Sequence, residues 1–219
     1  QQGRHGANMA MMRIDHPDIL DFINCKRIEG DISNFNISVT ITDEFMRKVK
    51  EEPDSLWMCK FNGEEVTPRQ ITRKGTKIIS VEDHRITVRE LFDTLTEASW
   101  SNGEPGIAFI DTVNNTNPLP RLGDIAVSNP CAEQFLHPYD NCNLGSINLA
   151  AFAQDGQFDY SELTRVTGIA VEMLDNVIDL MDSPVEKINE TAINNRRIGL
   201  GVMGWADVLS KLGVRYGSK

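Results

Sequence analysis

The sequence predicts an α/β protein, in which helices alternate with buried strands in a layered arrangement. Residues 34–41 alternate polar and apolar side chains, which is the two-residue period of a strand. Residues 159–182 repeat apolar side chains with the period of an amphipathic helix. Residues 87–110 combine a capped helix, a Gly/Pro turn and an apolar strand in succession. A chain of 219 residues can bury a sizeable core, and its length alone suggests one or two domains. The sequence shows no internal repeat or clear linker, so one compact unit is the simplest organisation.

Local signals set the boundaries of the elements in the first half of the chain. Thr42 and Thr87 are suited to cap the helices that follow them, and Asn62-Gly63 is the signal of a two-residue hairpin turn. In chain order we expect a strand at 9–14, a helix at 18–24, a strand at 34–41, a helix at about 43–51, strands at 56–61 and 77–81, a helix from 87 to about 100, and a strand at 107–110. A polar loop at 112–123 follows.

The second half is dominated by the long helix at 159–182, which Ser183-Pro184 ends. Its inner face is expected to contain seven apolar residues, Leu163, Val166, Ala170, Met173, Leu174, Val177 and Ile178. The remaining elements are a strand or turn at 144–149, a shorter helix at 185–194, a strand at 196–202 and a last helix at about 204–212, which Gly213 closes.

Composition restricts the class of protein. Hydrophobic residues make up 40% and charged residues 25% of the chain, as in ordinary globular proteins. The net charge of -10 argues against a surface that binds nucleic acid or an anionic membrane. No apolar run approaches the roughly 18 residues of a membrane-spanning helix, and no secretory signal is present. Four cysteines are too few for a disulfide scaffold, so we expect a reducing cytoplasm.

The segment 128–134 carries the most chemically suggestive residues, because Asn129, Cys131 and Glu133 occupy alternate positions. Pro130 disfavours a helical conformation at Asn129, so we expect an extended segment whose three side chains point to one side. An amide, a thiol and a carboxylate together supply a hydrogen-bond donor, a nucleophilic or radical sulfur, and a base. A second cysteine, Cys142, follows shortly afterwards.

The sequence also allows three other interpretations. Cys131 and Cys142 could be inert buried thiols, and the residues alone leave this open. Cys131, Glu133, His137 and Cys142 could ligate a metal, but their spacings lack the close pairs of zinc sites, so no metal is expected. The glycines of 199–204 match a dinucleotide-binding pattern, yet they lie within an apolar strand, and we interpret them as allowing close packing.

Several segments in register resemble the large, catalytic subunit of ribonucleotide reductases. The resemblance is strongest in Asn129-Pro-Cys-Ala-Glu-Gln134 followed by Cys142-Asn-Leu-Gly-Ser-Ile-Asn-Leu149, which is similar to the active-site finger loop of the adenosylcobalamin-dependent class II enzymes. Matching segments occur along the whole chain, at 6–10, 15–19, 34–39, 106–111 and 196–202. Several motifs in the family order are far more specific than any one of them.

The resemblance implies a portion of a ten-stranded α/β barrel with a central finger loop, in which residues 1–219 are a central part of the barrel domain. It implies that Cys131 becomes a thiyl radical, that Glu133 acts as general base, and that Asn129 binds substrate hydroxyls. Cys142 would be one of two thiols that reduce the substrate and end as a disulfide. These roles define a ribonucleoside-diphosphate or -triphosphate reductase that supplies deoxyribonucleotides for DNA synthesis.

The resemblance also implies partners. They are a ribonucleotide substrate, deoxynucleotide or ATP effectors, a thioredoxin-like reductant, adenosylcobalamin, and a second subunit in a homodimer. The loop 25–33 is similar to the family's specificity loop, which makes Lys26, Arg27 and Asp31 candidate recognition residues. Two alternatives remain: a class I large subunit with a separate radical-generating metal subunit, and a non-catalytic nucleotide-binding regulatory module.

Parts of the family pattern are missing from the chain. Neither Cys25 nor Cys59 stands where the partner of Cys142 is expected, which should lie upstream of Gln1. The phosphate-binding segment and the cysteine-bearing tail would lie beyond Lys219. We therefore expect a piece of a longer polypeptide, with its N- and C-terminal parts absent, that does not reduce ribonucleotides by itself.

Overall fold

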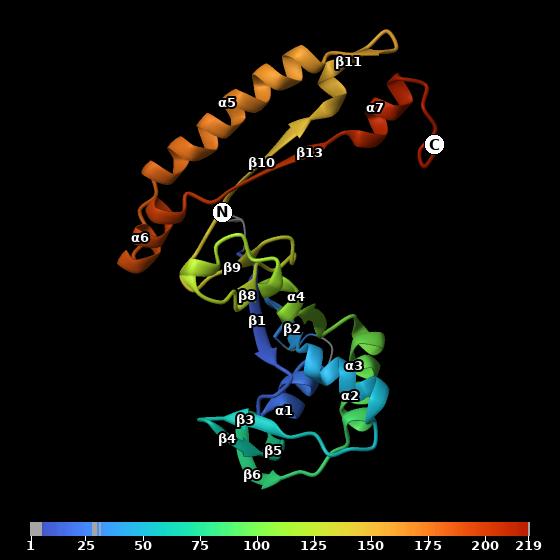
Figure 1. Ribbon diagram of the computed structural model, residues 1–219, viewed down its shortest axis with the longest axis vertical. Helices are drawn as coiled ribbons and strands as arrows, with labels where there is room; N and C mark the ends of the chain where they lie inside the picture. Colours follow the sequence, from blue (N-terminus) through green and yellow to red (C-terminus); the bar gives the residue numbers. More distant parts are fainter. Residues whose placement is uncertain (1–5, 28–29, 31, 219) are drawn as a thin grey trace. The chain divides into compact units, whose positions relative to one another are not determined.

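The structure is a computed structural model that describes residues 6–27, 30 and 32–218 (Figure 1). The chain forms two compact units, residues 1–138 and 139–219, and each is described by itself. This division corrects the expectation from the sequence that the chain forms one compact unit. The physical reason is that the parallel strands form two separate sheets, and each sheet has its own hydrophobic core.

The first unit is built on a three-stranded parallel sheet in the order β1-β2-β7, formed by β1 (Asn8–Arg13), β2 (Phe35–Ile41) and β7 (Gly106–Phe109). Helices α1 (Ile19–Asn24), α2 (Asp43–Glu51) and α3 (Val88–Asn102) bury their apolar faces in the same core as β2. Within this core, Phe45 of α2 is fully buried and packs edge-on against Trp57, with ring centroids 4.9 Å apart. The strand and helix predictions for these six elements are confirmed.

Both predicted helix caps are present. The Thr42 hydroxyl accepts a hydrogen bond from the Phe45 N–H at the start of α2. Thr87 and Glu90 form a reciprocal capping box at the start of α3. These side chains satisfy N–H groups that a helix leaves without intrahelical acceptors, which is why they fix the two boundaries.

Two antiparallel hairpins lie between α2 and α3. The first joins β3 (Cys59–Phe61) to β4 (Glu64–Val66) through Asn62 and Gly63, and both turn residues have positive φ as the sequence predicts. The second joins β5 (Arg69–Lys74) to β6 (Lys77–Asp83). Strand β5 was not predicted, because its residues are mostly charged or polar. Its Arg73 makes a bidentate ion pair with Asp21 of α1.

One short helix also differs from the prediction. Residues 110–115 form α4 (Ile110–Asn115), where the sequence suggested the end of a strand and a polar loop. The Asn114 side chain accepts a hydrogen bond from the Ile125 N–H and donates one to the Ile125 carbonyl. This non-local bridge stabilises the helix end, and no local sequence pattern reports it. A 3₁₀ turn, η1 (Pro120–Leu122), follows.

The second unit contains the parallel pair β10 (Asn143–Asn148) and β13 (Ile198–Met203), along which the long helix α5 (Tyr160–Asp179) lies (Figure 1). The other elements are η2 (Leu149–Phe152), the hairpin β11 (Ala153–Gln154) and β12 (Gln157–Phe158), and helices α6 (Glu186–Asn195) and α7 (Trp205–Lys211). The predicted strands and helices of this half are confirmed, and the small β11–β12 hairpin is additional.

Close packing explains the glycine pattern at 199–204. A Cβ on Gly199 would lie 2.6 Å from the Leu144 side chain on the neighbouring strand. Gly204 has positive φ, and a Cβ there would collide with the Asn148 side chain. These glycines therefore serve the contact between β10 and β13 and the turn into α7, in agreement with the packing interpretation.

The buried face of α5 is narrower than the sequence suggests. Leu174 and Ile178 are buried, and Leu163, Val166 and Ala170 pack against the core of the unit. Met173 and Val177, which were expected on the same face, are exposed within this chain. A two-stranded sheet covers only a narrow stripe of a helix, so the outer members of the predicted face find no cover in this unit.

Candidate functional site

The segment with Asn129, Cys131 and Glu133 is the end of a β-hairpin in the first unit. Strands β8 (Val127–Ser128) and β9 (Phe135–Leu136) pair antiparallel. The pairing continues to the Asn129 N–H, which donates to the Gln134 carbonyl at 3.1 Å. Residues 130–133 are the turn that joins the two strands. Cys131 therefore lies at the tip of a short projection.

The predicted extended conformation is wrong for this turn. The chain reverses direction between Asn129 and Gln134, and Ala132 adopts the left-handed conformation, with φ of 61°. The Ala132 N–H donates to the Asn129 carbonyl, closing the turn. Alternate positions therefore do not share one face here. All three residues instead belong to one tight hairpin end, between Asn129 and Gln134.

Asn129 organises this turn with its side chain. Its Oδ1 accepts a hydrogen bond from the Gln134 N–H at 3.1 Å, so the amide takes the place of a backbone acceptor in the hairpin. Asn129 is half-buried, whereas Cys131 and Glu133 are exposed. The thiol and the carboxylate are therefore accessible to a ligand from outside the chain, while the base of the turn is fixed.

The hairpin is attached to the sheet by two contacts. Asn36 of β2 donates a hydrogen bond from Nδ2 to the Pro130 carbonyl at 2.9 Å. The buried Ser128 donates from its backbone N–H to the Met11 sulfur of β1 at 3.1 Å. The first contact joins the polar side of β2 to the residue that precedes Cys131. The sequence shows a polar stripe on β2, but it does not show what the stripe contacts.

Cys142 belongs to the second unit, where it is half-buried immediately before β10. Its neighbours are held by other elements of that unit. Asn143 donates from Nδ2 to the Leu174 carbonyl of α5 at 3.1 Å. Asp140 forms an ion pair with Arg197, just before β13. The structure therefore groups Asn129, Cys131 and Glu133 in one turn and assigns Cys142 to a separately described unit.

The predicted specificity loop is described only in part. The Lys26 ammonium is largely buried, forms an ion pair with Glu104 and donates to the Phe35 carbonyl at 2.6 Å. The Asn102 side chain donates to the Lys26 carbonyl, so Lys26 ties the loop to the end of α3. Arg27 is exposed. Asp31 lies outside the described residues.

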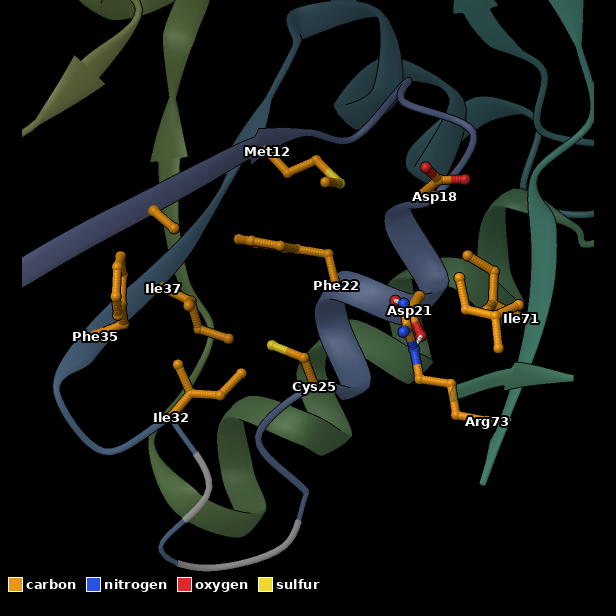
Figure 2. A pocket seen from close by; sticks show the side chains of 12 residues that line it. Met12, Asp18, Asp21, Phe22, Cys25, Ile32, Phe35, Ile37, Ile71 and Arg73 are labelled. Atoms are coloured by element: carbon orange, nitrogen blue, oxygen red, sulfur yellow. Dashed lines mark hydrogen bonds and ion pairs between the residues drawn. The ribbon is translucent and has the colours of Figure 1, made fainter. Parts of the chain in front are cut away.

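A cavity of about 470 Å³ borders this loop (Figure 2). It is lined by Phe22 of α1, by Cys25 directly after that helix, by Phe35 and Ile37 of β2, and by Ile71 of β5. Burial raises the pKa of the Cys25 thiol, and the Asp21 charge adds to this effect. The cation among the described lining residues, Arg73, is already paired with Asp21. The cavity therefore suits an apolar group better than a phosphate.

Two further observations apply to the described part of the chain. It contains no group of three or more His, Cys, Asp or Glu side chains that could hold a metal ion. His137, which was weighed as a ligand, is buried with Nε2 3.1 Å from the Gly123 carbonyl oxygen. Among the same residues, no helix combines the length and apolar character needed to cross a membrane.

The described fold is a parallel α/β arrangement that presents an Asn-x-Cys-x-Glu turn at the end of a hairpin. The model of the ribonucleotide reductase barrel domain matches residues 1–219. The chain therefore belongs to the ribonucleotide reductase family, and its two parallel sheets are part of an α/β barrel. The α/β class expected from the sequence is confirmed.

Individual relatives agree with this family. The chain is 42% identical over 217 residues to a vitamin B12-dependent ribonucleoside-diphosphate reductase of Mycobacterium tuberculosis (strain CDC 1551 / Oshkosh), covering 99% of this chain and 29% of the relative. It is also 42% identical to the enzyme of the same name from Thermoplasma acidophilum, covering 98% of this chain and 26% of the relative. The chain is 30% identical to a ribonucleoside-diphosphate reductase subunit alpha of Chlamydia muridarum, and the match covers 99% of this chain and 22% of the relative. The chain thus spans less than a third of the length of these relatives.

Proposed function

We propose that the whole protein reduces ribonucleotides to deoxyribonucleotides by thiyl-radical chemistry, as an adenosylcobalamin-dependent class II enzyme. The observation that carries this proposal is the turn 130–133, which presents an exposed thiol two residues from an exposed carboxylate and is closed by the Asn129 amide. The relatives named vitamin B12-dependent range from 28% to 42% identity, and the matches at 42% exceed the 30% of the subunit alpha, which favours class II over class I.

Each residue has a defined task in this reaction. A Cys131 thiyl takes the 3′ hydrogen atom of the substrate and returns a hydrogen atom at the end. Glu133 accepts the 3′-hydroxyl proton, and Asn129 hydrogen-bonds substrate hydroxyls. Cys142 and a second thiol supply two electrons and two protons. The 2′-hydroxyl leaves as water, and the two thiols become a disulfide.

The geometry of the turn fits an external source of the radical. Cys131 is exposed and lies at the tip of a hairpin whose base is fixed by hydrogen bonds, so a bound cofactor has access to the sulfur without unfolding the turn. When bound in the full-length protein, adenosylcobalamin would supply the radical that the Cys131 thiol receives. The described chain contributes the thiol, the turn that holds it, and the contact from Asn36.

The remaining partners follow from the same chemistry. A dithiol reductant of the thioredoxin type must reset the disulfide after each turnover, which requires a reducing compartment, the cytoplasm. Nucleotide effectors, with Lys26, Arg27 and Asp31 as candidate recognition residues, and a homodimer complete the proposal. Residues 1–219 are proposed to form part of one barrel domain that is inactive by itself. Sustained reduction of ribonucleotides by the purified 219-residue chain would contradict this last point.

The test is ribonucleotide reduction by the full-length protein, with and without adenosylcobalamin. We expect activity only with the cofactor, and a loss of at least about a thousandfold in Cys131→Ser. Cys59→Ala is the control, because it removes another thiol of the first unit that lies outside both the turn and the loop 25–33, and the folded variant should keep its activity. Activity that requires a second protein subunit instead of the cofactor would support class I. Effector binding that is unchanged in Cys131→Ser, with no reductase activity in the wild type, would support a regulatory module.

A further inference from the structure

The strand that follows Cys142 begins in a densely held segment of the second unit. Residues 140, 141 and 143 each make a side-chain contact to a different place in that unit. Asn141 donates from Nδ2 to the Met181 sulfur at 3.5 Å, and Asn143 donates to the Leu174 carbonyl. Asp140 pairs with Arg197. The backbone on both sides of Cys142 is therefore fixed by side chains.

The Asp140–Arg197 pair is the most buried of these contacts. The Asp140 side chain is 0% exposed and the Arg197 side chain 13%. Arg197 donates from Nε at 2.8 Å, and its Nη2 lies 2.7 Å from the same carboxylate oxygen, Oδ2. The other oxygen, Oδ1, accepts the Asn141 N–H at 3.0 Å. Both carboxylate oxygens are therefore satisfied, as a buried charge requires.

The register of the sheet relates this pair to Cys142. The first paired residues of the parallel strands β10 and β13 are Asn143 and Ile198. Cys142 and Arg197 immediately precede them, on chains that lie about 4.8 Å apart in a sheet. An ion pair between Asp140 and Arg197 thus clamps the start of one strand to the start of the other, with Cys142 between the clamp and the first paired residue.

We propose that Asp140 and Arg197 are positioning residues that hold the Cys142 thiol in its reactive place. This inference rests on the proposed function, in which Cys142 delivers electrons to the substrate. Buried ion pairs gain little net stability over apolar side chains of similar volume, so a role in fixing geometry accounts better for this one. The adjacent Arg196 offers a contrast, because its partners Asp175 and Asp179 lie on the exposed surface of α5.

The experiment uses the reduced full-length protein and two measurements. The first is the rate of iodoacetamide alkylation at Cys142, quantified by peptide mass spectrometry with Cys131 as an internal reference. The second is kcat and KM for ribonucleotide reduction. The variants are Asp140→Asn, Arg197→Lys and the double variant Asp140→Leu/Arg197→Met, which leaves no unpaired buried charge and so preserves folding. Arg196→Gln is the matched control.

In Asp140→Asn and in the double variant we expect the alkylation rate of Cys142 to change by about fivefold or more, because the segment opens locally. The rate at Cys131 should stay within about twofold. kcat should fall at least about tenfold with little change in KM. Arg197→Lys should show smaller changes in both measurements than Asp140→Asn, because an ammonium group keeps the charge on the carboxylate but not the two-donor fork of the guanidinium. Arg196→Gln should resemble the wild type.

The two proposals fail in different ways. If the wild type makes no deoxynucleotide but the Cys142 alkylation rate responds to the pair as expected, the positioning of Cys142 stands and the proposed reaction fails. If the wild type is active and the folded double variant matches it in Cys142 alkylation and in kcat, the positioning role is overturned. Equal changes at Cys131 and Cys142 would also overturn it, because they would indicate a general loss of structure.

Discussion

Replacing Asn36 with alanine tests how the turn that carries Cys131 is held. The Asn36 Nδ2 donates to the Pro130 carbonyl at 2.9 Å, across a sequence separation of 94 residues. A hydrogen bond contributes about 0.5–1.5 kcal/mol net, and this one is exposed, so we expect the lower half of that range. RT is about 0.6 kcal/mol at room temperature, so losing about 0.5–1 kcal/mol should raise the equilibrium constant for local opening of the turn roughly twofold to fivefold.

Hydrogen exchange in the full-length protein measures this opening. The amides of Asn129, Ala132 and Gln134 donate within the hairpin, so a peptide that spans them should exchange roughly twofold to fivefold faster in Asn36→Ala. Asn34→Ala is the matched control, because the hydrogen bonds at Asn34 use its backbone carbonyl and survive the substitution. Unchanged exchange in Asn36→Ala, or equal acceleration in Asn34→Ala, would refute the reasoning.

Two further predictions concern the core of the first unit. Burial raises the pKa of the Cys59 thiol from 9.0 to about 12, and the Asp15 charge adds to this effect. The unfolded chain therefore loses this proton at lower pH, and the stabilising contribution is complete below about pH 9 and is lost as the pH rises towards 12. Urea unfolding should show a steeper loss of stability with alkaline pH in the wild type than in Cys59→Ala, and parallel slopes would contradict the prediction. Gly106→Ala should destabilise the protein by about 1–3 kcal/mol, because the new Cβ would lie 2.8 Å from the Ser38 Oγ. Ser38→Ala in the same molecule should restore most of the unfolding midpoint, since the next contact is at 3.8 Å; no recovery would argue against this clash.

Local signals account for the elements that the sequence predicted correctly. The side chains of Thr42 and Thr87 each accept a hydrogen bond from the N–H three residues further along the chain. Asn62 and Gly63 are the two positive-φ residues of their hairpin turn. Such features are encoded by neighbours in the chain. The strands and helices next to them were therefore predicted within a few residues.

The errors concern features that depend on distant residues. Strand β5 is polar in sequence and is held by ion pairs to α1, including Arg73 to Asp21. The turn 130–133 was predicted as extended because Pro130 disfavours a helical conformation at Asn129, whereas the fold brings β9 back onto β8. Asp140 and Arg197 are 57 residues apart, and no single-sequence pattern relates them. The motif yields the candidate reactive residues, whereas the contacts that support them are visible only in the structure.

The left-handed conformation of Ala132 limits which sequences this turn can accept. An L-residue pays about 1 kcal/mol or more for that conformation, and glycine pays almost nothing. Between the thiol and the carboxylate, natural variation should therefore allow glycine, asparagine or aspartate and should exclude valine and isoleucine. The residue between Cys131 and Glu133 takes no part in the proposed chemistry, yet its backbone conformation should restrict how it varies.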